Sequence, residues 1–180
     1  MNIGIISWLL TICMIRGTQN MVPNIQLIQV PITDTETILV MYKAAFKQLF
    51  MKYHDVNTSP YLEQKSNLVK KMRDPRSTYY YIKTSKHVVG LVRVIVSDSG
   101  QEARISPLSI LPEFQGNGFG SSTLLQLEGL YSRVKIWSVD TIVQEQHLLA
   151  FYTHCGYQTT HESVYHIQPG MDLVQLVKKA

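Results

Sequence analysis

The segment from Leu108 to Tyr131, LSILPEFQGNGFGSSTLLQLEGLY, combines three patterns in a fixed order. An apolar run that ends at Pro112 predicts a buried strand. A turn rich in glycine and small polar residues follows, and then leucines recur at spacings of three and four, the period of a helix with one buried face. This order predicts an anion site, because the first N–H groups and the positive end of the helix dipole point out of the helix start.

The spacing of the glycines indicates which kind of anion site this is. A dinucleotide fingerprint requires G-x-G-x-x-G, whereas the glycines here alternate as G-x-G-x-G. A Walker loop requires a lysine after its last glycine, and this turn has none. The pattern that fits is Gln-x-x-Gly-x-Gly, formed by Gln115, Gly118 and Gly120. The alternative is a glycine-rich turn that simply opens a helix.

Together with the preceding Leu-x-Ile-x-Pro-Glu-Phe, this pattern resembles the pyrophosphate-binding turn of the GNAT superfamily of N-acetyltransferases. The resemblance implies that acetyl-coenzyme A is the co-substrate. It also implies that the backbone at the end of the strand holds the pantetheine and that the amides of the turn bind the pyrophosphate. The residues implied in coenzyme binding are Ser109, Ile110, Leu111, Gln115, Gly116, Asn117, Gly118, Phe119, Gly120 and Ser121.

A second segment, AFYTHCGY from Ala150 to Tyr157, resembles the superfamily's helix that ends in tyrosine, a few variable residues and glycine. The resemblance implies that the hydroxyl of Tyr152 faces the sulfur of the coenzyme. When an amine displaces coenzyme A, a thiolate leaves, and a phenol with a pKa near ~10 can hydrogen-bond to it or protonate it. The alternative is a core tyrosine at the end of an amphipathic helix.

The predicted base is one of two carboxylates. Many relatives have an asparagine seven residues before the tyrosine, where this sequence has Glu145. A carboxylate there could meet a cationic acceptor or act as a base through a water. Asp140, next to the predicted fifth strand, is the second candidate. Some relatives have no dedicated base, so neither residue is required. A finer resemblance, carried by residues 104–107, Trp137 and residues 140–145, is to a subgroup of bacterial acetyltransferases without an assigned acceptor.

The periodicities predict one α/β (α+β) domain over residues 21–180. The expected strands cover residues 25–30, 78–83, 88–96, 102–111, 134–142, 157–166 and 171–177, and the expected helices cover residues 33–50, 60–74, the segment after the glycine turn, and 146–155. The resemblance implies a mixed, mostly antiparallel sheet of six or seven strands, about four flanking helices, and splayed fourth and fifth strands. Five aromatic side chains in the first two helices could line the acceptor pocket or belong to the core: Tyr42, Phe46, Phe50, Tyr53 and Tyr61.

Composition excludes several classes of protein. Hydrophobic residues make up 45% of the chain and charged residues 17%, which is typical of a globular domain. The formal charge of +4 suits a polyanionic ligand and is too diffuse to indicate nucleic acid. The six histidines show no ligand spacing, so no metal site is predicted. Cys13 and Cys155 lie far apart in sequence, which favours a reducing, cytoplasmic compartment.

Residues 1–20 form a hydrophobic extension with no charge between Ile3 and Ile15. That run is shorter than the ~20 residues that span a bilayer, so no stable membrane span is predicted. It also lacks the basic start of a signal peptide. Two interpretations remain, an extra hydrophobic helix or a leader upstream of a true start at Met21, and we expect the second.

The leading hypothesis is an acetyl-coenzyme A-dependent N-acetyltransferase that moves an acetyl group to a primary amine by direct transfer in a ternary complex. The acceptor is predicted to be a small-molecule amine or a protein amine, with a homodimer as one possible assembly. A non-catalytic acyl-coenzyme A sensor on the same fold and a membrane-associated protein are the alternatives.

Overall fold

The structure is a computed structural model that describes residues 23–180, without the side chains of residues 160–163. The predictions for residues 1–20 and for a start at Met21 therefore lie outside the described residues. Within residues 23–180, none of the helices combines the length and the apolar character needed to cross a membrane.

The centre of the fold is a sheet of seven strands in the order β1-β2-β3-β4-β5-β7-β6. The strands are β1 (Gln26–Gln29), β2 (Ser77–Lys83), β3 (Val88–Val96), β4 (Glu102–Ile110), β5 (Ile136–Ile142), β6 (Gln158–Gln168) and β7 (Met171–Lys179). Only the β4–β5 pair is parallel, and the other neighbours are antiparallel. The predicted mixed, mostly antiparallel sheet is therefore confirmed.

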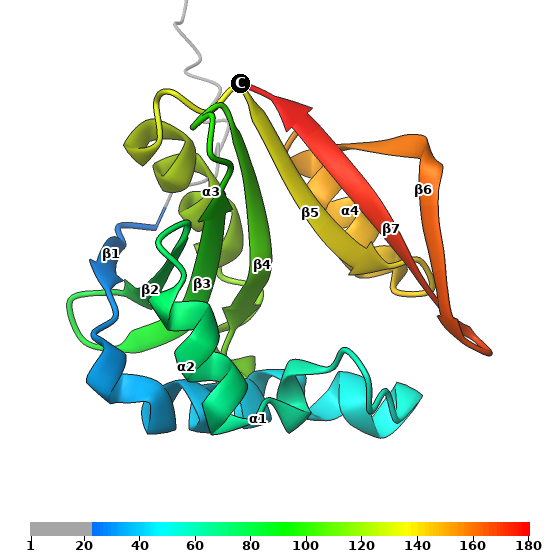
Figure 1. The fold of residues 1–180 in the computed structure, drawn as a ribbon, viewed down its shortest axis with the longest axis horizontal. Coiled ribbons are helices and arrows are strands. Elements are labelled where there is room, and N and C mark those ends of the chain that lie inside the picture. Colours follow the sequence, from blue (N-terminus) through cyan, green and yellow to red (C-terminus); the bar gives the residue numbers. More distant parts are fainter. Residues whose placement is uncertain (1–22) are drawn as a thin grey trace, which may run out of the picture.

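Among residues 23–180, four α-helices cover the two faces of this sheet, as predicted. They are α1 (Thr35–Tyr53), α2 (Lys65–Arg73), α3 (Phe119–Leu130) and α4 (Gln146–His154). Helices α1 and α2 pack through Ile38 and Leu68 against Leu91 of β3. Helices α3 and α4 contribute Leu124 and Tyr152 to a separate core on the sheet's other side. Figure 1 shows α1 crossing beneath the strands and α4 behind β5 and β7.

The predicted helix over residues 60–74 is wrong at its start. The structure has a short 3-10 turn at Pro60–Leu62, and α2 begins only at Lys65. The backbone of Gln64 between them is extended, with φ −90° and ψ 141°. The oxygen of Ser59 accepts the N–H of Tyr61 and caps the start of this turn, and Glu63 at its end is also extended, with ψ 129°.

Strands β4 and β5 pair over only four residues and then diverge (Figure 1). The last pair is Ile105 with Val139. Immediately after it, the β3–β4 register shifts, so that Ser106 and Pro107 form a bulge in β4. A bulge bends its strand, and a proline has no N–H to donate to a neighbour. Pairing with β5 therefore ends here, and the predicted splay of the fourth and fifth strands is confirmed.

The end of β4 is held tightly against β3 at Gly90. A Cβ atom on Gly90 would lie 2.3 Å from the carbonyl oxygen of Ser109 and 2.9 Å from Cδ1 of Ile110. The hydroxyl of Ser109 also donates to the carbonyl of Leu91 at 3.1 Å. The close approach of the two backbones fixes the strand end that borders the gap between β4 and β5.

Gly90→Ala should therefore destabilise the protein, because the added methyl group meets backbone that cannot move independently of the sheet. We expect a loss of about 3 kcal/mol in the free energy of unfolding, measured by urea denaturation. Gly129→Ala in α3 is the matched control, because a Cβ there meets nothing within 4 Å. It should leave stability unchanged or raise it by up to ~1 kcal/mol. Equal stability of the two variants would contradict the close β3–β4 approach.

Candidate functional site

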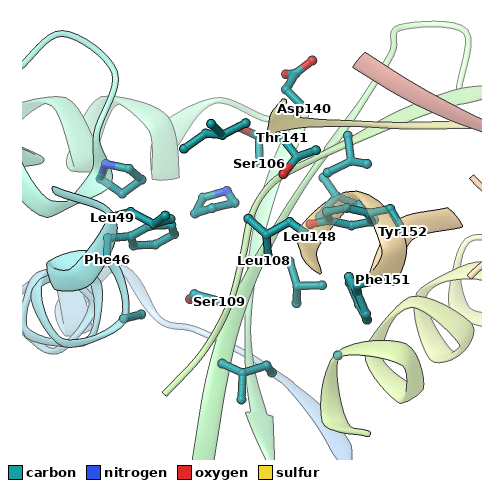
Figure 2. A pocket seen from close by; sticks show the side chains of 18 of the residues that line it. Phe46, Leu49, Ser106, Leu108, Ser109, Asp140, Thr141, Leu148, Phe151 and Tyr152 are labelled. Carbon is teal, nitrogen blue, oxygen red and sulfur yellow. The ribbon is translucent and has the colours of Figure 1, made fainter. Parts of the chain in front are cut away.

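A cavity of about 780 Å³ lies where β4 and β5 diverge. Its walls come from β4, the glycine turn, the start of α3, β5, α4, β7, and the end of α1 with the loop that follows. Figure 2 shows Phe46 and Leu49 on one side of this space and Tyr152 on the other, with Leu108 between them. Segments more than a hundred residues apart in sequence therefore border one space.

The glycine turn needs its glycines for two different reasons. Gly118 is the N-cap of α3 and has φ +76°, a left-handed conformation that disfavours other residues. A Cβ on Gly120 would lie 3.0 Å from the ring of Phe151 in α4. Gly118 therefore allows the chain to turn into α3, and Gly120 allows the start of α3 to approach α4 closely.

Polar side chains of the turn bond to backbone carbonyls. Asn117 Nδ2 donates to the carbonyls of Phe114 and Gln115 at 3.1 and 3.0 Å, and Ser121 Oγ donates to that of Gly118 at 2.9 Å. The first intrahelical bond across this turn is that of the Ser122 N–H to Gly118. The N–H groups before it point out of the helix start, so the turn offers an anion its backbone amides and the helix dipole.

The end of β4 directs backbone groups toward the gap. The N–H of Leu111 donates to the carbonyl of Val89 on β3 at 2.9 Å. Because hydrogen-bonding sides alternate along an antiparallel strand, the polar groups of Ile110 face away from β3, where β5 has departed. The Ile110 carbonyl accepts from Gln115 Nε2 at 3.0 Å.

Eight of the ten residues implied in coenzyme binding line the cavity. Leu111 and Asn117 do not: the Leu111 N–H donates to β3, and the exposed Asn117 side chain donates to carbonyls of the turn.

Tyr152 of α4 lines the cavity and is only 6% exposed. Its ring packs edge-on against Phe151 and Tyr157, at centroid distances of 4.8 and 5.8 Å. Burial, and to a smaller degree Cys155 and Asp140, raise the pKa of its phenol well above the usual value. The hydroxyl is therefore a protonated hydrogen-bond donor at neutral pH.

Asp140 also lines the cavity, and it forms an ion pair with Arg104 across the start of the gap. Arg104 comes from β4 and Asp140 from β5, so the pair joins the two strands just where they separate. The sequence showed both residues but not their pairing.

Glu145 lies beside the cavity and is not among its lining residues. Its carboxylate is buried and accepts hydrogen bonds from Lys52 Nζ and the Tyr53 hydroxyl, both at 2.6 Å. Burial raises the pKa of this carboxyl, but the hydrogen bonds from Lys52 and Tyr53 outweigh burial and lower it overall. Glu145 thus ties the end of α1 to the start of α4. Its role as a base stays a prediction.

The five aromatic side chains proposed for the acceptor pocket divide into three groups. Phe46 and Tyr53 line the cavity. Tyr42 is 1% exposed and belongs to the core beneath α1. Phe50 and Tyr61 stack on each other at 4.5 Å, away from the cavity lining. Periodicity could not separate them, because all but Tyr61 lie on one long helix.

Comparison with known proteins identifies the family to which the chain belongs. The model of the acetyltransferase (GNAT) family matches residues 41–157, which is more than half of the chain and includes the glycine turn and Tyr152. The chain therefore belongs to the GNAT acetyltransferase family, and it is an acetyltransferase. No protein of curated function matches the sequence.

Solved structures share the fold at low sequence identity. An acetyltransferase from Thermus thermophilus has a TM-score of 0.67 at 16% identity and covers 88% of this chain and 99% of its own. The spermidine N-acetyltransferase of Vibrio cholerae in complex with CoA and spermine has a TM-score of 0.68 at 18% identity, covering 86% and 95%. The ribosomal-protein-S18-alanine N-acetyltransferase of Escherichia coli has a TM-score of 0.68 at 12% identity, covering 87% and 94%.

Glu145→Gln separates a stabilising role from a catalytic one. Because the folded-state pKa of Glu145 is lowered, its contribution to stability is complete above the unfolded pKa of ~4.3 and is lost as pH falls through the folded pKa. We expect wild type to exceed the variant by about 1–2 kcal/mol in the free energy of unfolding at pH 7, with the difference shrinking below about pH 4.3 and vanishing only below the lowered folded-state pKa. Urea denaturation across pH measures this difference.

The turnover number kcat of the same variant tests the predicted base. A positioning role leaves kcat within about tenfold of wild type, whereas loss of a base typically costs 10²-fold or more. Lys52→Met, which removes the ammonium but keeps the carboxylate, is the control. A collapse of kcat in Glu145→Gln alone, without loss of stability, would establish the base.

Proposed function

We propose that the protein transfers the acetyl group of acetyl-coenzyme A directly to a primary amine in a ternary complex. One observation carries this proposal: the glycine turn and the hydroxyl-bearing Tyr152 border the same cavity, between two strands that have separated. A site for a polyanion and a hydrogen-bond donor for a leaving group are both required for this reaction, and here they share one space.

In this proposal the coenzyme lies along the gap between β4 and β5. The amides around Gly118 would bind the pyrophosphate at the positive end of α3. The backbone of Ile110 would hold the pantetheine as an added strand, because its polar groups face the gap. The backbone rather than the side chains would bind the phosphates, because the side chains of Asn117 and Ser121 already donate to neighbouring carbonyls.

The chemistry places a negative charge on sulfur near Tyr152. The amine nitrogen attacks the thioester carbonyl carbon, the C–N bond forms and the C–S bond breaks, and the electron pair leaves on the coenzyme sulfur. A thiol has a pKa near ~8.5, so full proton transfer from a phenol whose pKa is raised would be uphill. The Tyr152 hydroxyl would therefore act chiefly as a hydrogen-bond donor that stabilises the departing thiolate.

The amine must lose its own proton during the reaction. Of the two carboxylates predicted as bases, Asp140 lines the cavity and Glu145 does not. Asp140 is therefore the candidate acceptor of this proton, directly or through water, with Arg104 fixing its position.

Tyr152→Phe tests this role, because it keeps the ring and its packing but removes the donor. We expect kcat to fall by roughly 10²–10³-fold, as for other donors aimed at developing charge, while affinity for acetyl-coenzyme A and melting temperature stay near wild type. Release of free coenzyme A thiol with a panel of primary amines measures turnover.

Tyr157→Phe is the matched control for this variant. Tyr157 is fully buried beside Tyr152, outside the cavity lining, and its hydroxyl has no hydrogen-bond partner within the described part of the chain. Removing the Tyr157 hydroxyl should leave kcat unchanged. Full turnover in Tyr152→Phe would remove Tyr152 from the mechanism.

A further inference from the structure

The far end of the cavity, away from the glycine turn, is apolar. Helix α1, the loop after it, α4, β5 and β7 contribute this wall. Its apolar side chains are Phe46, Leu49, Pro60, Ile142, Leu148, Met171 and Leu173. Figure 2 shows Phe46 and Leu49 across the cavity from Leu148. Such a wall binds hydrocarbon, because apolar surface is removed from water on both sides of the contact.

Among the described residues, two carboxylates line the cavity. The negative charge of each is already stabilised by hydrogen bonds or an ion pair within the protein. Asp55 is 2% exposed and accepts the N–H groups of Asn57 and Thr58 at 2.9 Å each, and also the hydroxyl of Thr58. Asp140 is paired with the guanidinium of Arg104. Asp55 already accepts three hydrogen bonds, and Asp140, which the proposed function assigns to the reacting nitrogen, is not available to a second ammonium of the same ligand.

Two neutral polar groups at this end have partners within the protein. The Tyr53 hydroxyl donates to Glu145 at 2.6 Å, and Ser59 Oγ accepts the N–H of Tyr61 at 3.3 Å. The wall therefore offers a ligand mainly apolar contact.

We propose that the acceptor is a monoamine on an alkyl or arylalkyl body, and that polyamines are poor acceptors. This inference rests on the proposed function and names the class of its acceptor. The reacting nitrogen would enter as the end of an apolar chain that fills the far wall. A second ammonium there would lose its water without gaining a carboxylate, which is unfavourable. The acceptor of the Vibrio cholerae spermidine N-acetyltransferase does not carry over, because 18% identity supports the shared fold alone.

Two amines of equal length test this proposal directly. The two amines are heptylamine and 1,6-diaminohexane. They have the same chain length, but heptylamine ends in a methyl group where the diamine carries its second ammonium. With the full chain and acetyl-coenzyme A, we expect kcat/KM for heptylamine to exceed that for the diamine by roughly tenfold or more. Spermidine should behave like the diamine, and phenethylamine like heptylamine.

A charge placed in the wall should change this preference. Leu49 lies on α1 and is partly buried in the apolar wall. Leu49→Glu should shift the ratio of the two kcat/KM values toward the diamine by about tenfold, since the new carboxylate pairs with the second ammonium. Leu49→Gln, of the same size but neutral, should still prefer heptylamine.

The outcomes separate this inference from the function on which it rests. A wild type that acetylates the diamine or spermidine as well as heptylamine overturns the acceptor class and keeps the acetyltransferase. A protein that acetylates a protein amine but no free monoamine also overturns the acceptor class alone, whereas one that binds acetyl-coenzyme A but acetylates neither kind of amine overturns both.

Discussion

The structure depends on the loss of pairing between β4 and β5 after Ile105 and Val139. A fully paired sheet would satisfy its backbone internally and leave no gap for a ligand. The bulge at Ser106–Pro107 ends the pairing, and Pro107 has no N–H with which to continue it. Everything that makes the site follows from this separation: a cavity between the strands, backbone groups of β4 that face it, and room for the start of α3.

The opened sheet is held at its edges by contacts that cross the gap. Arg104 and Asp140 join the two strands where they separate. At the far end, Glu145 receives hydrogen bonds from Lys52 and Tyr53, which ties α1 to α4. The Gln168 amide also donates to the backbone carbonyl of Tyr53, which connects the β6–β7 turn to α1. Side-chain contacts thus bridge the gap at both ends of the cavity.

Most of the fold and the glycine turn could be predicted from the sequence, because the patterns that indicate them are local. The glycine turn, its strand and its helix are contiguous, and the alternation and periods predicted the separate strands and helices almost completely. Their arrangement in one mixed sheet came from the family resemblance. The break between Pro60–Leu62 and α2 escaped prediction because it consists of two residues with extended backbone, Glu63 and Gln64, which leave no mark in the apolar pattern.

Contacts between distant segments were not predictable in the same way. The pairing of Glu145 with Lys52 joins residues 93 positions apart and leaves no mark in the local pattern. For the same reason the pattern could not show that Tyr42 belongs to the core whereas Phe46, one helical turn later, lines the cavity. The apolar acceptor wall draws single residues from several elements, so it too appears only once the chain is folded.

The central claim is that the glycine turn in this gap binds the pyrophosphate of acetyl-coenzyme A, and calorimetric titration of Gly118→Asp tests it most directly. The control is Gly100→Asp, in the β3–β4 turn outside the cavity lining, because its φ of +71° is close to the +76° of Gly118 and imposes similar backbone strain. The account predicts that affinity for acetyl-coenzyme A falls at least about tenfold in Gly118→Asp, because a carboxylate there repels the phosphates, and stays at the wild-type value in Gly100→Asp. Unchanged affinity in a folded Gly118→Asp protein would contradict the account and place the coenzyme elsewhere.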